Sequence, residues 1–150
     1  MPSLKTIQTI RFHHLKRVSF RNKGLIKDWV ARILKDAKLS VAAINYIFCS
    51  DGYLKNINKE YLGHDYYTDI ITFDLSESGA PITADIYISI DRVKDNARQF
   101  AKSFEHELLR VIFHGALHLS GYKDKSDKDA EIMREKEDYY LSRFLKAASR

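Results

Sequence analysis

Hydrophobic and polar positions follow two different spacings along this chain of 150 residues. Short stretches that are apolar, or that alternate with polar residues, predict strands at about residues 6–12, 41–49, 68–75 and 82–90. Longer stretches with apolar residues every three to four positions predict helices at about residues 22–37, 51–61, 91–102, 105–119 and 126–146. The predicted elements therefore follow the order βαβαββααα.

This order predicts how the strands pair. A helix between the first two strands favours a right-handed crossover, which makes those strands a parallel pair. The turn-like residues 76–81 join the last two strands and favour an antiparallel hairpin. We therefore expect an α+β fold, a mixed four-stranded sheet packed with about five helices, and the length favours a single domain over residues 1–150.

The helix predicted at residues 105–119 is apolar around nearly its whole circumference, which is typical of a buried helix, yet it carries two histidines. His114 and His118 are four residues apart, so both imidazoles lie on one face and could share a metal ion. Gly121 can end the helix in a left-handed conformation and bring Asp124 back toward the pair. Two nitrogens and one carboxylate oxygen form the ligand set of an open, catalytic metal site. The alternative is two helical histidines without a metal, one packed and one exposed.

The stretch from His114 to Asp124 resembles the signature H-G-x-L-H-L-x-G-Y-D-H of the YbeY family, the metal-dependent endoribonucleases that mature ribosomal RNA in bacteria. Three further segments, at residues 58–73, 84–89 and 107–114, resemble other motifs of that family in the same order. The resemblance covers roughly residues 40 to 140, and it implies the same α+β fold, with the metal site on the buried helix and facing a cleft beside the loop at residues 62–68.

The resemblance also implies the ligands. The family holds one zinc ion with three histidines, and His114, His118 and Asp124 stand at the corresponding positions. Aspartate can bind zinc through oxygen, but an oxygen ligand also suits manganese or magnesium. We therefore expect one Zn²⁺ per chain, with another divalent metal possible because of Asp124.

Other positions depart from the family motif. Leu62 stands where the family has an arginine, and His64 stands where it has a lysine. We expect water on the metal held by His114 to be the nucleophile, and the ribose 2′-OH of the RNA stays open as the alternative. His64 is a candidate proton shuttle or phosphate donor. Arg110, one turn before His114, is a further candidate that could orient a ligand or hold a phosphate. It could instead form an i, i+3 ion pair with Glu107 on a solvated strip.

Charge is distributed unevenly. Residues 1–38 hold ten Lys and Arg against two Asp and Glu, whereas the whole chain has a net charge of +5. A basic end on a near-neutral body favours a polyanionic partner such as RNA, although a solvated lysine-rich surface would give the same count.

Cys49 is the one cysteine, so the chain cannot form an internal disulfide and fits a reducing compartment. No apolar stretch approaches the roughly 18 residues that a membrane span needs, and the first residues show no signal-peptide pattern. We therefore expect a cytoplasmic protein with no membrane partner.

The resemblance to the YbeY family therefore implies a metal-dependent, single-strand-specific endoribonuclease that acts in 16S rRNA 3′-end maturation and ribosome quality control. Its expected partners are ribosomal RNA and the small ribosomal subunit, and the oligomeric state stays open. One alternative is a metal hydrolase of another substrate, although Gly115 stands where a metalloprotease would carry its general base. The other is a non-catalytic ribosome-binding or RNA-binding factor with a structural metal. Leu62 at the position of the family's arginine favours this second alternative.

Overall fold

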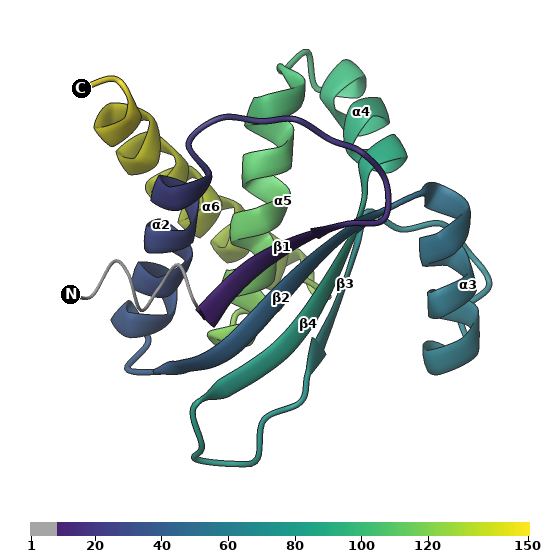
Figure 1. The fold of residues 1–150 in the computed structure, drawn as a ribbon, viewed down its shortest axis with the longest axis horizontal. Helices are drawn as coiled ribbons and strands as arrows, with labels where there is room; N and C mark the ends of the chain where they lie inside the picture. Colours follow the sequence, from purple (N-terminus) through teal and green to yellow (C-terminus); the bar gives the residue numbers. More distant parts are fainter. Residues whose placement is uncertain (1–8) are drawn as a thin grey trace.

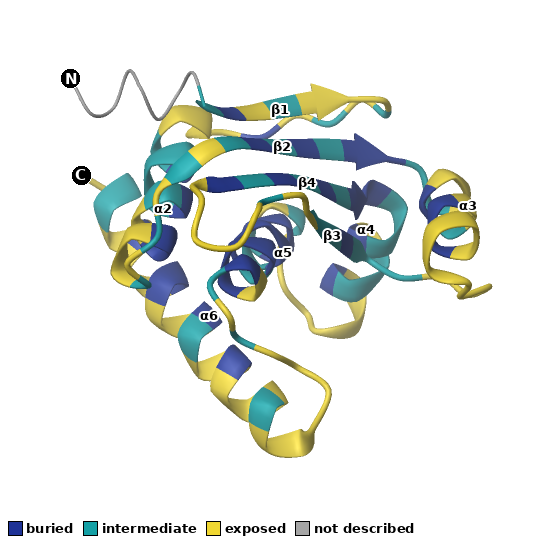
Figure 2. Ribbon diagram, turned by 90° about the horizontal axis from the view of Figure 1, so that it is seen from below, coloured by how far each residue is buried: buried dark blue, intermediate teal, exposed yellow. Residues whose placement is uncertain are grey.

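The computed structural model describes residues 9–150 and shows one four-stranded sheet with most helices on one face (Figures 1 and 2). The strands are β1 (Ile10–His14), β2 (Val41–Cys49), β3 (Ile70–Asp74) and β4 (Ile82–Ser89). The helices are α2 (Lys23–Asp36), α3 (Asp51–Leu62), α4 (Ile90–Gln99), α5 (Phe104–Leu119) and α6 (Asp127–Ala148). The predicted α+β class and the order of elements are confirmed.

The sheet has the strand order β1-β2-β4-β3. β1 pairs with β2 in parallel, β2 pairs with β4 in parallel, and β3 pairs with β4 antiparallel, as predicted. The first predicted strand is displaced, because β1 begins at Ile10 and continues to His14. Residues 6–8 of that prediction lie outside the described residues. The predicted strand at 68–75 shortens to β3, so Thr68 and Asp69 belong to the preceding loop.

A serine stands at the N-cap position of four of the helices. Ser50, Ser89, Ser103 and Ser126 each accept a hydrogen bond from the backbone N–H three residues further on. These bonds satisfy donors that a helix otherwise leaves free at its first turn. Within residues 9–150, no helix combines the length and apolar character needed to cross a membrane.

α5 is the central helix of the core. It lies between the sheet and a layer formed by α2, α4 and α6, and ten of its sixteen residues are buried (Figure 2). The Tyr46 hydroxyl on β2 donates to the Ile112 carbonyl at 2.8 Å. A Cβ atom built on Gly115 would lie 3.1 Å from the Cδ1 atoms of Ile70 and Ile86. Glycine therefore allows α5 to approach β3 and β4 closely. Because His114 is next to Gly115 in α5, this contact also fixes the position of His114 relative to the sheet.

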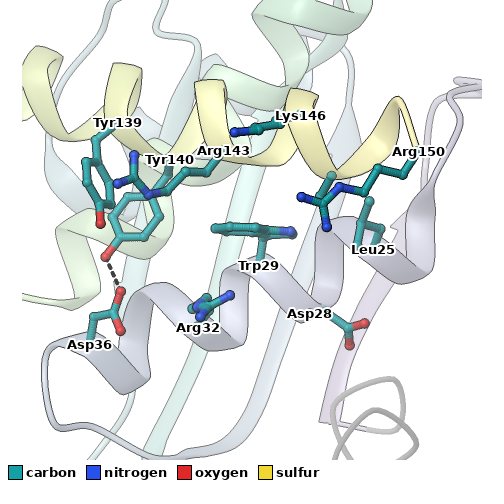
Figure 3. A pocket seen from close by; sticks show the side chains of 11 residues that line it. Leu25, Asp28, Trp29, Arg32, Asp36, Tyr139, Tyr140, Arg143, Lys146 and Arg150 are labelled. Atoms are coloured by element: carbon teal, nitrogen blue, oxygen red, sulfur yellow. Dashed lines mark hydrogen bonds between the residues drawn. The ribbon is translucent and has the colours of Figure 1, made fainter.

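α6 packs along both α5 and α2. Its Phe144 meets Phe113 of α5 edge to face, with ring centroids 5.9 Å apart. Its Tyr140 donates a hydrogen bond of 2.6 Å from the hydroxyl to Asp36 at the end of α2 (Figure 3). The last helix is thus attached to the first described one, and one turn before Tyr140 its Glu137 reaches His114 of α5.

Among residues 9–150, α3 is the helix that covers the other face of the sheet, at one end. Cys49 belongs to a small buried cluster there, with Leu54, Ile57 and Ile71. Burial raises the pKa of the Cys49 thiol to about 12. Since the thiolate is the reactive form, this cysteine is a structural residue.

The close approach at Gly115 generates a stability prediction. We expect Gly115→Val to lower the free energy of unfolding by about 1–3 kcal/mol, because its branched side chain would overpack the contact with β3 and β4. Gly24→Val is the matched control, since nothing lies within 4 Å of a Cβ at Gly24, and it should cost less than about 0.5 kcal/mol. Chemical denaturation measures both, and equal stabilities would contradict the account of the α5 contact.

Candidate metal centre

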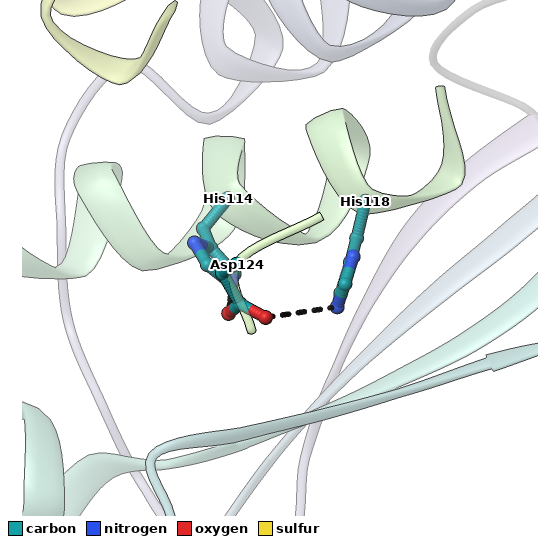
Figure 4. A group of neighbouring side chains, drawn as sticks. All are labelled: His114, His118 and Asp124. Atoms are coloured by element: carbon teal, nitrogen blue, oxygen red, sulfur yellow. Dashed lines mark ion pairs between the residues drawn. The ribbon is translucent and has the colours of Figure 1, made fainter. Parts of the chain in front are cut away.

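His114, His118 and Asp124 come together as the sequence predicts (Figure 4). One ligand atom from each residue lies within 4.8 Å of the other two. The His114 Nε2 atom is 3.3 Å from Asp124 Oδ2, and the His118 Nε2 atom is 3.9 Å from Asp124 Oδ1. The two imidazole nitrogens and the carboxylate therefore converge on one point.

The turn after α5 brings the carboxylate to this point. Gly121 has a φ of 104°, which side chains rarely adopt. Its N–H donates to the His118 carbonyl at 3.0 Å, and the next N–H, of Tyr122, donates to the Leu117 carbonyl at 3.1 Å. The helix thus ends in a left-handed glycine turn, as predicted, and the chain reverses so that Asp124 faces the histidines.

The partners of the two Nδ1 atoms decide which ring nitrogens are free. His118 Nδ1 lies 2.9 Å from the Tyr122 carbonyl, which can only accept, so Nδ1 carries the proton. His114 Nδ1 lies 2.8 Å from the Glu137 carboxylate, which likewise fixes the proton on Nδ1. Both Nε2 atoms then offer lone pairs toward Asp124. This is how proteins orient histidines that bind metals, so the residues present fit a divalent ion.

A buried network holds Glu137 in place. Arg110 donates from Nη1 to Glu137 at 2.8 Å and from Nη2 to Asp138 at 3.2 Å, and its Nε lies 3.6 Å from Glu107. The predicted ion pair between Arg110 and Glu107 exists, but both side chains are largely buried, so the solvated strip is wrong. Arg110 is committed to carboxylates and acts on His114 through Glu137, so it is a positioning residue.

The surroundings of the histidines are negative. Burial opposes protonation of His114, but its hydrogen bond to Glu137 and the nearby carboxylates outweigh burial and raise its pKa. Burial, and then the charge on His114, lower the pKa of His118. Burial also raises the pKa of Asp69, which interacts with His114. Negative charge around His114 stabilises the protonated, positively charged form of its imidazole. The same negative charge would stabilise a metal cation bound to the ring in place of that proton.

The centre opens into a hollow of about 460 Å³. On one side lie residues of the loop between α3 and β3, and on the other lie the three candidate ligands and Lys125. The predicted cleft beside residues 62–68 is therefore confirmed. His64 and Leu62 both line it, and the His64 ring stacks on Tyr66 with centroids 5.2 Å apart.

Sequence reasoning missed Glu137 and Asp69. Glu137 lies on the buried face of α6, among apolar residues such as Met133, Leu141 and Phe144. A carboxylate on such a face needs a partner, and that signal could have identified it. Asp69 precedes β3, and its carboxylate accepts from Asn96 at 3.2 Å beside His114. It lines a second hollow of about 350 Å³, as do Glu137 and Asp124.

The bond to His114 generates a prediction for Glu137. We expect Glu137→Gln to lower the affinity for divalent metal about 10–100-fold, because the imidazole loses the charge that orients it and makes it basic. Glu135→Gln, at an exposed position of the same helix, should leave the affinity unchanged. Titration calorimetry with purified apoprotein measures both, and thermal melting shows that each variant is folded. Equal metal affinities of the wild type and Glu137→Gln would show that Glu137 does not contribute to the metal centre.

Comparisons with known proteins identify the family of the chain. The family model described as Endoribonuclease YbeY matches residues 9–145. The Endoribonuclease YbeY of Cytophaga hutchinsonii is 55% identical over 81% of this chain and 85% of its own length, and that of Flavobacterium johnsoniae is 49% identical over 90% and 96%. The solution structure of the Thermotoga maritima protein TM1509 superposes with a TM-score of 0.63 at 32% identity, over 94% of this chain and 92% of that one. The chain belongs to the YbeY endoribonuclease family.

Proposed function

We propose that this protein is a metal-dependent, single-strand-specific endoribonuclease that acts in 16S rRNA 3′-end maturation and ribosome quality control. We place it in the cytoplasm, with ribosomal RNA and the small ribosomal subunit as partners. The observation that supports this most strongly is the convergence of His114 Nε2, His118 Nε2 and the Asp124 carboxylate at an open hollow. In a chain of the YbeY family, such an arrangement supports metal-assisted cleavage of RNA.

We propose that His114, His118 and Asp124 hold one divalent ion, and that this ion is zinc. When bound, the ion would supply Lewis acidity toward a phosphodiester oxygen and a water of lowered pKa. The protein supplies the rest: Glu137 and the Tyr122 carbonyl hold the two rings with their lone pairs aligned. The negative charge around the site balances the charge of the ion.

The walls of the hollow support a role for His64. Its ring is exposed, stacks on Tyr66 and lies beside the Tyr66 hydroxyl at 3.0 Å. It faces the same space as the candidate ligands, so it is available to carry a proton or to donate to a phosphate. Lys125 lines the same hollow and offers a positive charge there, whereas Leu62 stands at the position of the family's arginine.

The open geometry argues against a purely structural metal. A structural zinc is usually enclosed by four protein ligands, whereas the described residues bring three ligand side chains together here. The His118 and Asp124 side chains are 39% and 40% exposed, so a water or a substrate oxygen can reach the remaining position. Gly115, which replaces the metalloprotease base, packs toward the sheet and offers no group to a peptide substrate.

Cleavage of RNA tests the proposal directly. We expect the wild type to cleave a 3′-extended small-subunit rRNA fragment, and His114→Ala to lose more than about 100-fold in rate, because changes that merely disturb ligand orientation already cost about 10–100-fold. His106→Ala is the matched control, since His106 lies more than two turns earlier on α5 and lines a separate hollow. Equal cleavage by all three proteins would point to a contaminating nuclease. No cleavage by the wild type, even with small subunits added, would favour a binding factor.

The third ligand should determine the choice of metal. We expect Asp124→His, which restores the family's three histidines, to shift the preference further toward zinc over manganese and magnesium, because imidazole is a softer donor than carboxylate. Asp124→Ala should weaken binding of every divalent ion. Competition titrations of the three proteins with each metal measure this, and identical preferences for wild type and Asp124→His would show that Asp124 is not a ligand.

A further inference from the structure

A groove of about 640 Å³ runs between α2 and α6, on a part of the surface separate from the metal centre. Arg143 and Lys146 reach it from α6, Arg150 from the residues just after that helix, and Trp29 and Arg32 from α2 (Figure 3). The groove thus joins cations and aromatic rings from opposite ends of the described chain.

The cations of this groove have no carboxylate partners. Within residues 9–150, no ion pair forms at Arg32, Arg143, Lys146 or Arg150, although elsewhere Arg92 and Arg110 do pair with carboxylates. The groove also contains Asp28 and Asp36, of which Asp36 accepts the hydrogen bond from Tyr140. Four unpaired cations beside two acids leave an excess of positive charge, and an anion in the groove would relieve it.

Two arginines of the groove lie over aromatic rings. The Arg143 guanidinium carbon lies 3.7 Å from the centre of the Tyr139 ring, and that of Arg32 lies 5.1 Å from the Trp29 ring. A guanidinium that is stacked on an aromatic face loses little freedom when it binds a phosphate in a bidentate manner. Cations alternating with aromatic rings are the usual components of surfaces that bind single-stranded nucleic acid.

The cations of the groove continue along one face of α6 toward Tyr122. Lys136, Tyr139, Arg143 and Lys146 are spaced by three or four residues on α6 and form a continuous stripe, and Arg150 follows just beyond the end of the helix at Ala148. The Lys136 ammonium lies 5.7 Å from the Tyr122 ring and 5.8 Å from the Tyr139 ring. Tyr122 in turn provides the carbonyl that holds His118. We name this stripe, together with Trp29 and Arg32, the α6 track.

We propose that the α6 track binds the single-stranded RNA that flanks the cleaved bond, with phosphates on its arginines and lysines and bases against its aromatic rings. This rests on the proposed function, since Lys136 at one end of the track lies beside Tyr122, whose carbonyl bonds to His118. From Lys136 to the end of α6 at Ala148 the track covers about 18 Å of helix. The RNA must therefore extend well beyond the cleavage position to occupy it, so the track selects long single strands.

Binding to an inactive protein tests the track independently of cleavage. In a His114→Ala background, Arg143→Gln/Lys146→Gln should weaken binding of a long fluorescent single-stranded RNA roughly ten-fold and should reduce the slope of log affinity against log salt by about 1.4, the loss of two phosphate contacts. Lys59→Gln/Lys94→Gln removes the same charge from exposed positions on α3 and α4 and should change neither quantity appreciably. A short RNA that covers only the cleavage site should bind equally to all three proteins.

Tyr139 distinguishes a stacking surface from a general positive field. We expect Tyr139→Ala to weaken binding of the long RNA about ten-fold, and Tyr139→Phe to retain it, because either ring can support Arg143 and stack on a base. In the cleaving protein, Arg143→Gln/Lys146→Gln should raise KM for the long RNA and leave kcat unchanged. Circular dichroism and thermal melting check that these surface variants keep the fold.

Three results would overturn the proposal. One is an equal weakening of RNA binding by Arg143→Gln/Lys146→Gln and by its matched control, which would show that only the net charge of the protein matters. Another is unchanged binding of bare RNA together with lost binding to the small subunit, which would assign the groove to a protein partner. The third is tighter binding of a duplex than of the single strand. Because the binding arm uses inactive protein, a failure of cleavage leaves this test intact.

Discussion

The contact between His114 and Glu137 is the interaction on which the site depends. A carboxylate in the apolar interface between α5 and α6 is costly unless it is fully paired. Glu137 meets that requirement with the His114 imidazole and the Arg110 guanidinium, and these bonds together lower its pKa although burial acts in the opposite direction. The same bond fixes the proton of His114 on Nδ1 and leaves Nε2 free. It also attaches the middle of α6 to the face of α5 that carries His114 and His118, so the packing of the two helices and the geometry of the candidate site are inseparable.

The sequence predicted the parts of the site that are local in the chain. His114, His118, Gly121 and Asp124 lie within three turns of one another, and helix periodicity with one glycine turn is enough to bring them together. Glu137 and Asp69 come from a different helix and from a loop before a different strand, so their positions depend on how α6 and β3 pack against α5. Spacing along the chain contains no information of that kind. The buried face of α6 did contain a hint, because a carboxylate occupies a position that apolar residues would otherwise fill.

The fold was predictable for the same reason. Alternating and helical spacings are local, and they identified each described strand and helix to within a few residues. The main displacement, at β1, occurs where the strand is short, lies at the edge of the sheet and has exposed residues, so the apolar pattern there is weak. The resemblance to the YbeY family predicted the cleft beside residues 62–68, which the geometry of β3 and α5 then formed. Arg110 was identified as a candidate, but only the tertiary structure shows that its partners are carboxylates rather than a phosphate.

The positions of the charged residues show what a count over one segment of the sequence cannot predict. The excess of Lys and Arg in residues 1–38 is real, but several of these cations lie against aromatic rings, as Lys23 does on Phe20 and Lys27 does on Phe12. Arg32 is the member that reaches the α2–α6 groove, where it meets Arg143, Lys146 and Arg150 from the last helix. A count over the first residues could not include that helix, because the fold, through contacts such as Tyr140 with Asp36, brings the two together. Which cations can contact a polyanion together therefore depends on packing, which brings those of the first and last described helices into one groove.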